Sequence, residues 1–244
     1  MRNLSVPSLQ HLARNWDQNP VEVKKSLIRL YDNPPTFSYN PVHQMLHDRL
    51  VLNVPLEQVL HAVRTHVARP SVRDNYLELI PLIDSYFQHI RPTYVHTVAG
   101  RQYPVARNLM VPFAPPLVYG AGGEVCFPWF SLWKSNPLVG ENLSLFVSVV
   151  RELVLQDPDL EASRFLILDL SAKKKEQHRA LKIVDSRDVP ILSNYRLREM
   201  LDVFSKGYFD AVREISNRPA TQEIADAAQL NKDRRQGDFF LSPE

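Results

Sequence analysis

Glycine is distributed very unevenly along this chain. The sequence of 244 residues contains 7 glycines and 19 prolines, and no glycine precedes Gly100. Loops that bind nucleotide phosphates depend on glycine, because their backbone adopts positive φ angles and approaches the phosphate closely. The sequence therefore excludes a Rossmann or P-loop domain in its first hundred residues.

Proline divides the residues before Pro92 into short segments with helical periodicity. In most of these segments apolar residues recur three and four positions apart, which is typical of amphipathic helices. The segments are 8–16, 21–31, 42–52, 56–68 and 71–90. Pro81 lies inside the last segment and predicts a kink or a break there. We expect residues 1–92 to form a helical subdomain.

Strand-like patterns begin after Pro92. Residues 93–98 and 103–105 predict one hairpin on either side of Gly100. Residues 117–119 and 125–133 predict a second hairpin, and the glycines from Gly120 to Gly123 supply its turn. This glycine turn lacks the spacing and the following helix of a phosphate-binding loop, so we interpret it as a strand connection.

The rest of the chain completes an α+β pattern. Residues 164–170 contain the apolar run FLILDL, which predicts a strand buried on both faces, and residues 180–184 are expected to pair with it antiparallel. Helices are expected at 141–155 and from Ser193 to Ile215. The order β-β-β-β-α-β-β-α implies an α+β fold with a mostly antiparallel sheet flanked by helices.

We therefore expect three parts: a helical subdomain at 1–92, an α+β domain at 93–215, and at 216–244 a polar C-terminal tail with a short helix and an apolar end. The hydrophobic fraction of 44% and the charged fraction of 23% are ordinary for a soluble globular protein. The single cysteine, Cys126, excludes an intrachain disulfide and a cysteine-rich zinc site. No apolar segment is long enough to cross a membrane, and the first residues lack the apolar core of a secretory signal. We expect a cytoplasmic protein without a membrane partner.

An aromatic block at 127–134 is the sharpest candidate for a binding surface. On a strand, Trp129 and Trp133 lie on the same face, and an open face of this kind would let nucleic-acid bases stack. The alternative is a central core strand covered by helices on both faces. Candidate phosphate partners of the block are Lys134, Arg101 and Arg107.

Asp169 is the most conspicuous carboxylate, because it lies within the apolar run and would be costly to bury unpaired. Lys182 is expected opposite it, either as a structural ion-pair partner or as part of a catalytic set. An Asp on one strand with a Lys on the next resembles the PD-(D/E)xK nucleases, in which such groups bind Mg²⁺ and orient water. Ala180 occupies the position of the second acid, so a nuclease would need a displaced carboxylate such as Glu124.

Residues 8–30 resemble a helix-turn-helix, although the turn lacks its usual glycine. In that interpretation the second helix would present Lys24, Lys25 and Arg29 to DNA. At the other end of the sequence, Phe239 and Phe240 form an apolar cluster that either packs on the domain or docks on a partner.

These patterns contain no complete catalytic constellation. The leading hypothesis is a non-catalytic accessory protein that binds a protein partner, nucleic acid or both as part of a larger complex, without a cofactor. A formal net charge of +2 permits contact with nucleic acid. The alternatives are a divergent Mg²⁺-dependent nuclease using Asp169, Lys182 and Glu124, and a structural subunit that assembles through the aromatic face.

Overall fold

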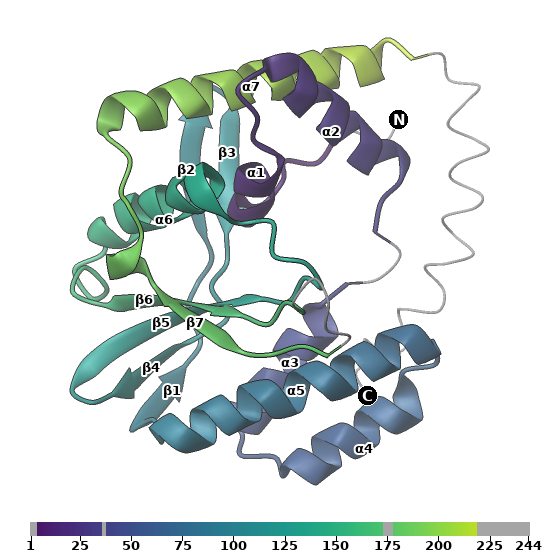
Figure 1. The fold of residues 1–244 in the computed structure, drawn as a ribbon, viewed down its shortest axis with the longest axis vertical. Helices are drawn as coiled ribbons and strands as arrows, with labels where there is room; N and C mark the ends of the chain where they lie inside the picture. The colour runs from purple at the N-terminus through teal and green to yellow at the C-terminus, as the bar shows by residue number, and fades with distance from the viewer. Residues whose placement is uncertain (1–3, 36–37, 173–177, 219–244) are drawn as a thin grey trace.

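The middle layer of the protein is a five-stranded mixed sheet (Figure 1). The computed structural model describes residues 4–35, 38–172 and 178–218. In spatial order the strands are β1 (Tyr94–His96), β4 (Val118–Ala121), β5 (Glu124–Ser131), β6 (Arg164–Asp169) and β7 (Lys182–Asp185). Strands β5 and β6 are parallel because helix α6 (Gly140–Leu155) crosses between them, and the other neighbouring pairs are antiparallel. The prediction of an α+β fold with a mostly antiparallel sheet is confirmed.

One of the two predicted hairpins is wrong. Strand β1 pairs with β4, and not with the residues that follow Gly100. Those residues form β2 (Arg101–Ala106), which pairs with β3 (Leu109–Phe113) in a separate two-stranded sheet. The physical reason is a local turn: Asn108 adopts a φ of 65°, so the chain reverses directly after Ala106 and brings β3 back along β2.

The second predicted hairpin is confirmed. Ala121 pairs with Glu124 across a two-residue turn made by Gly122 and Gly123, whose φ angles are 61° and 81°. Both values lie in the left-handed region that glycine adopts without steric cost, as such hairpin turns require. The glycine cluster therefore connects strands β4 and β5.

The apolar run FLILDL forms β6, of which every residue after Arg164 is buried. It pairs antiparallel with β7 and places Lys182 opposite Asp169, as expected from the sequence. A short 3-10 helix, η1 (Ser186–Asp188), follows β7.

One face of the sheet is covered by α3 (Asn40–Leu50), α4 (Leu56–His66) and α5 (Pro70–Ile90). Leu79 and Ile83 of α5 belong to the same buried cluster as Phe130 of the sheet. Pro81 does not break α5, because the buried residues before and after it keep one apolar stripe against the sheet.

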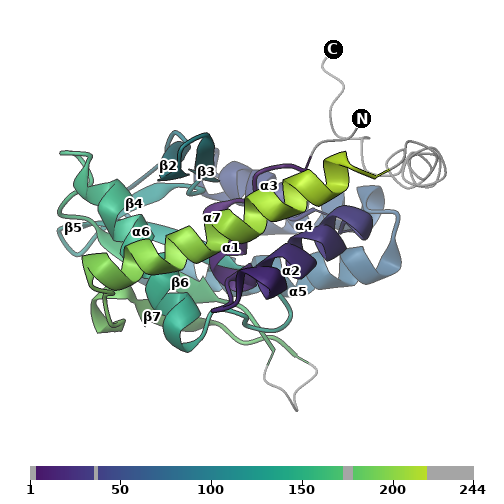
Figure 2. The ribbon, with the colours of Figure 1, turned by 90° about the horizontal axis from the view of Figure 1, so that it is seen from above.

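The other face is covered by α1 (Leu9–Asn15), α6 and the β2–β3 sheet, with α2 (Pro20–Asp32) and α7 (Asn194–Ser216) outermost (Figures 1 and 2). Helices α2 and α7 lie side by side, and the absence of a side chain at Gly207 permits this close approach to Val23. The helices before Pro92 thus divide between the two faces of the sheet, and a domain boundary near Pro92 stays a prediction. Within the described ranges, no helix is both long and apolar enough to cross a bilayer.

Candidate functional site

The carboxyl ends of the parallel strands β5 and β6 are held together by a buried arginine, Arg179. Its Nη1 lies 3.0 Å from the carbonyl oxygen of Leu132 after β5 and 2.8 Å from that of Leu170 after β6. Its Nη2 donates to the side-chain oxygen of Asn75 on α5 at 2.6 Å, and its backbone N–H donates to Glu78 on the same helix at 2.6 Å. Arg179 thus joins both strand ends to α5.

Asp169, the last residue of β6, is buried and uses both of its carboxylate oxygens within this edge. Oδ2 accepts a hydrogen bond from Asn136 after β5 at 2.9 Å, and Oδ1 accepts one from the backbone N–H of Ser171 at 3.0 Å. Lys182 lies opposite on β7, but its side chain points to solvent and forms no salt bridge with any residue the structure describes. The expected Asp169–Lys182 ion pair is therefore not formed, and the side-chain amide of Asn136 and the backbone N–H of Ser171 bind the carboxylate instead.

This position in the fold is where α/β proteins commonly bind ligands, because the chain leaves parallel strands there and exposes backbone and side-chain polar groups. The hydroxyl of Ser131, the last residue of β5, is buried and has no hydrogen-bond partner in the described part of the chain. A buried hydroxyl normally has a partner, so this edge retains unused hydrogen-bonding capacity.

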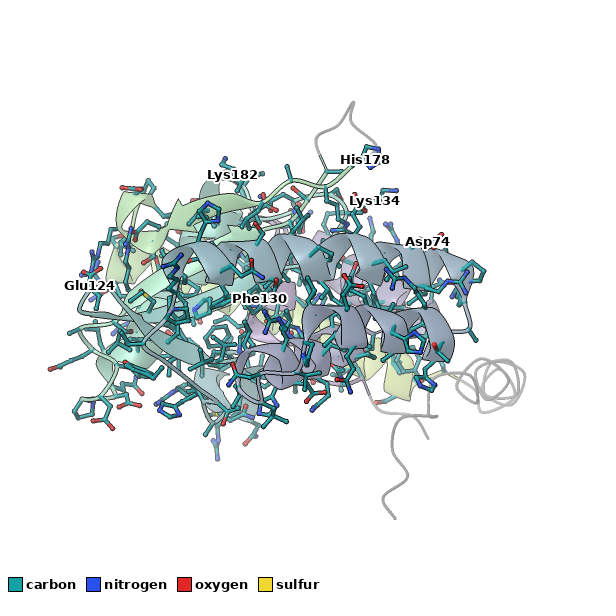
Figure 3. All side chains as sticks on the ribbon, turned by 90° about the horizontal axis from the view of Figure 1, so that it is seen from below. Asp74, Glu124, Phe130, Lys134, His178 and Lys182 are labelled. Carbon is teal, nitrogen blue, oxygen red and sulfur yellow. The ribbon has the colours of Figure 1, made fainter. Side chains whose placement is uncertain are left out.

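Three side chains next to residues of the network are exposed: Lys134 after β5, His178 before Arg179, and Lys182 opposite Asp169 on β7 (Figure 3). The imidazole of His178 is almost fully exposed and lies 3.9 Å from Glu78. Lys134, like Lys182, has no salt-bridge partner among residues 4–35, 38–172 and 178–218. We call Lys134, His178 and Lys182 the basic edge.

Glu124 is not part of this edge. It begins β5, beside the start of β6, whereas Asp169 ends β6, so the two carboxylates lie at opposite ends of the sheet. Glu124 instead pairs with Arg187 at 3.1 Å and with Arg164 at 3.7 Å. The expected nuclease set of Asp169, Lys182 and Glu124 is therefore not assembled. No three His, Cys, Asp or Glu side chains of the described residues are grouped so that they could hold a metal ion.

The aromatic block is covered rather than open. Trp129 is 7% exposed, and its ring centroid lies 4.8 Å from that of Phe146 on α6. Trp133 is half-buried, with the ring of His11 at 5.5 Å and the guanidinium of Arg14 at 5.2 Å from its centroid. Helices α1 and α6 thus cover this face, as the core-strand alternative describes, and Trp129 is too little exposed to stack on a base or to form an assembly contact.

Most of the other predicted cations are paired. Arg101 forms a salt bridge with Asp157, whereas Arg107 is exposed at the turn between β2 and β3. On α2, Lys24 pairs with Glu214 at 2.9 Å, Lys25 pairs with Glu22 at 2.7 Å, and Arg29 is exposed. Phe239 and Phe240 lie outside the described residues.

Two titratable side chains near the aromatic block are uncharged at neutral pH. Burial, assisted by the positive charge of Arg14, lowers the pKa of His11 from 6.5 to about 4. Burial also raises the pKa of the Cys126 thiol, so this cysteine stays protonated and is a poor nucleophile. Neither group adds charge or nucleophilic chemistry to the basic edge.

The sequence pointed to Asp169, Lys182 and Lys134 as candidates and gave no signal for Arg179, Asn136 or Ser131, which the structure places at the same edge. Arg179 lies in a polar stretch that is typical of a turn, and its neighbours in the sequence do not distinguish it from an exposed arginine. Its burial depends on Asn75 and Glu78, which are about a hundred residues away in the sequence.

Comparison with known proteins adds no assignment. No family model matches this sequence. No curated protein matches it either.

Proposed function

We propose that this protein is a non-catalytic accessory protein that binds nucleic acid through the basic edge. The observation that carries the proposal is the contrast between two groups of lysines. Lys24 and Lys25 on α2 are neutralised by Glu214 and Glu22, whereas Lys134 and Lys182 at the carboxyl edge have no carboxylate partner in the described structure.

Unpaired lysines are suited to the phosphate backbone. Each phosphate contact releases condensed counterions, so binding is sequence-independent and weakens steeply with salt. The backbone that presents these lysines is held in place: the backbone N–H of Ala172 donates to the carbonyl oxygen of Lys134 at 3.0 Å, and the backbone of Lys182 is paired with that of Asp169 between β6 and β7.

The test is a fluorescence-anisotropy titration of the full chain with short labelled DNA and RNA, single-stranded and duplex. The double variant Lys134→Glu/Lys182→Glu is expected to weaken binding at least about tenfold near 50 mM salt and to reduce the salt slope by roughly 2. The matched control, Lys25→Glu/Arg29→Glu, makes the same change in net charge on α2 and is expected to retain binding.

Three results would contradict the proposal. Absence of binding by the wild-type protein at low salt would remove it. Loss of binding in the α2 variant alone would move the contact to the helix-turn-helix segment. Cleavage of the oligonucleotide in Mg²⁺ buffer, abolished by Asp169→Ala, would favour the nuclease alternative.

A protein partner belongs to the same proposal and has its own supporting observation. The apolar side chains of Leu155 and Ile191 are 54% and 44% exposed and border a depression of about 240 Å³ beside α6. Exposed apolar groups around a concavity are typical of partner contacts. We expect a protein partner to co-purify in stoichiometric amount with the wild-type chain and with Lys134→Glu/Lys182→Glu. The variant Leu155→Glu is expected to abolish this co-purification. Equal recovery with Leu155→Glu would contradict this part.

A further inference from the structure

A second polar site lies at the β1 side of the sheet, remote in the fold from the basic edge beside β7. An open pocket of about 350 Å³ is lined by the C-terminal parts of α3 and α5 and by strand β1. Its volume falls in the range of small-molecule sites, about 300 to 1,000 Å³. The residues that matter for its chemistry are Arg49, Asp84, Phe87, Gln88, Thr93 and Tyr94.

A buried carboxylate forms the base of this pocket. Asp84 is 2% exposed, although it lies on a helix whose neighbouring residues belong to the apolar core. Its Oδ1 accepts a hydrogen bond from Nε of Arg49 at 2.6 Å, and its Oδ2 accepts one from Nε2 of Gln88 at 2.6 Å. Since removal of a charge from water is costly, such a group is retained only where its oxygens are satisfied.

The arginine is only partly used by this arrangement. Asp84 engages Nε and thereby fixes the orientation of the guanidinium plane, while the side chain of Arg49 remains 21% exposed at the pocket. Within the described ranges, neither Nη group of Arg49 has a hydrogen-bond partner. A guanidinium held by one edge presents the rest of its N–H groups as a planar fork, which matches the two oxygens of a carboxylate.

Apolar groups line the same pocket. The buried ring of Phe87 contributes to its wall, and Tyr94, which is 38% exposed, lies at its rim. The position of the rim depends on Gly120: a Cβ there would lie 2.3 Å from Cε1 of Tyr94 and 2.6 Å from Oγ1 of Thr93. The backbone of β4 therefore lets these two side chains lie directly over it.

We propose that this pocket binds a small organic acid, with its carboxylate on the Nη groups of Arg49 and its apolar part against Phe87 and Tyr94. Asp84 and Gln88 are positioning residues, because Asp84 holds the guanidinium and Gln88 donates to the second oxygen of Asp84. The inference is independent of nucleic-acid binding, since it shares no residue with the basic edge.

The test uses benzoate as the probe on the full chain, followed by backbone amide NMR. Saturable shifts are expected at Gln88, Thr93 and Tyr94, with a dissociation constant on the order of 1 mM. Benzamide, the neutral analogue of similar shape, is expected to bind about tenfold more weakly because it cannot accept a charge-assisted pair of hydrogen bonds.

Two variants sharpen the comparison. Arg49→Lys keeps a cation beside Asp84 but removes the fork, and it is expected to weaken benzoate binding by about tenfold. Arg64→Lys makes the same change at an exposed position of α4 and is expected to bind benzoate like the wild-type protein. If Arg49→Lys fails to fold, the comparison of benzoate with benzamide on the wild-type chain still tests whether the pocket selects a carboxylate.

The proposal is overturned if benzoate does not saturate, if benzamide binds equally well, or if a folded Arg49→Lys protein keeps full affinity. Stronger binding of benzylamine than of benzoate would also overturn it, because the pocket would then select a cation through Asp84.

Discussion

Arg179 donates a 2.6 Å hydrogen bond from Nη2 to the side-chain oxygen of Asn75, a residue 104 positions earlier in the chain. Its other terminal nitrogen lies within hydrogen-bond distance of carbonyl oxygens after β5 and β6. One buried cation therefore connects the layer of α3, α4 and α5 to the carboxyl ends of the parallel strands. The basic edge is built on this connection.

Replacement of Arg179 by Met is expected to lower the free energy of unfolding by about 3 kcal/mol, because the carbonyl oxygens of Leu132 and Leu170 and the side-chain oxygen of Asn75 lose their donor. Urea denaturation followed by circular dichroism measures this change. Arg187→Met removes an arginine that is 56% exposed and pairs with Glu124. It is expected to cost less than about 1 kcal/mol, and equal losses for the two variants would contradict the assigned role of Arg179.

Asp169 provides a second test of the same edge. Asp169→Asn keeps an oxygen that can accept from the N–H of Ser171, so we expect a loss of about 1 kcal/mol. Asp169→Ala leaves that N–H and the amide of Asn136 without their acceptor and is expected to cost about 2 to 3 kcal/mol. Thermal unfolding of both variants measures the difference. If alanine and asparagine cost the same, the hydrogen bonds of Asp169 do not stabilise the edge.

Gly207 sets the distance between α2 and α7. A Cβ at this position would lie 2.7 Å from the carbonyl oxygen of Pro20 and 2.7 Å from Cβ of Val23. Backbone oxygen cannot move aside as a flexible side chain can, so Gly207→Ala is expected to destabilise by about 1 to 3 kcal/mol despite its better helix propensity. Lys206→Ala, on the exposed side of the same helix, is the control and should leave the melting temperature nearly unchanged.

The sequence-based predictions succeeded where the determining residues are close in the chain. The β4–β5 turn needs only Gly122 and Gly123 to adopt positive φ angles, and the burial of β6 follows from its own apolar run. The pairing of β1 with β4 could not be predicted from neighbouring residues, because β2 and β3 lie between the two strands in the sequence.

The candidate site shows the same limit. The prediction that Asp169 is buried opposite Lys182 on the next strand needed only two neighbouring strands. Its true partner, Asn136, follows β5 and is brought to it only by the parallel crossover through α6. The steric requirement at Gly207 likewise comes from α2, at the other end of the described chain.

Acid is expected to destabilise the fold through His11. Its pKa is about 4 in the folded protein and 6.5 when exposed, so the unfolded chain binds more protons between these values. Stability that is present above pH 6.5 is therefore lost as the pH falls toward 4, by up to roughly 3 kcal/mol at about 1.4 kcal/mol per pKa unit.

The variant His11→Phe keeps a ring against Trp133 and removes the titration. Urea denaturation at several pH values should show a flatter dependence between pH 6.5 and 4 for this variant than for the wild-type protein. Identical pH profiles would show that another group causes the acid sensitivity.

The pairing of α2 with α7 has a consequence for synthesis of the chain on the ribosome. Trp16 donates its indole N–H to the carbonyl oxygen of Met200, which is 184 residues later, and Val23 and Leu27 are buried in the same cluster as α7. Helices α3, α4 and α5 can contact one another once residue 90 has emerged, whereas the main partner of α2 is α7, which is made more than 160 residues after α2. A nascent chain that pauses before residue 194 therefore leaves the apolar stripe of α2 exposed, where it can aggregate or bind chaperones. Translation of α7, the last described helix, covers this stripe.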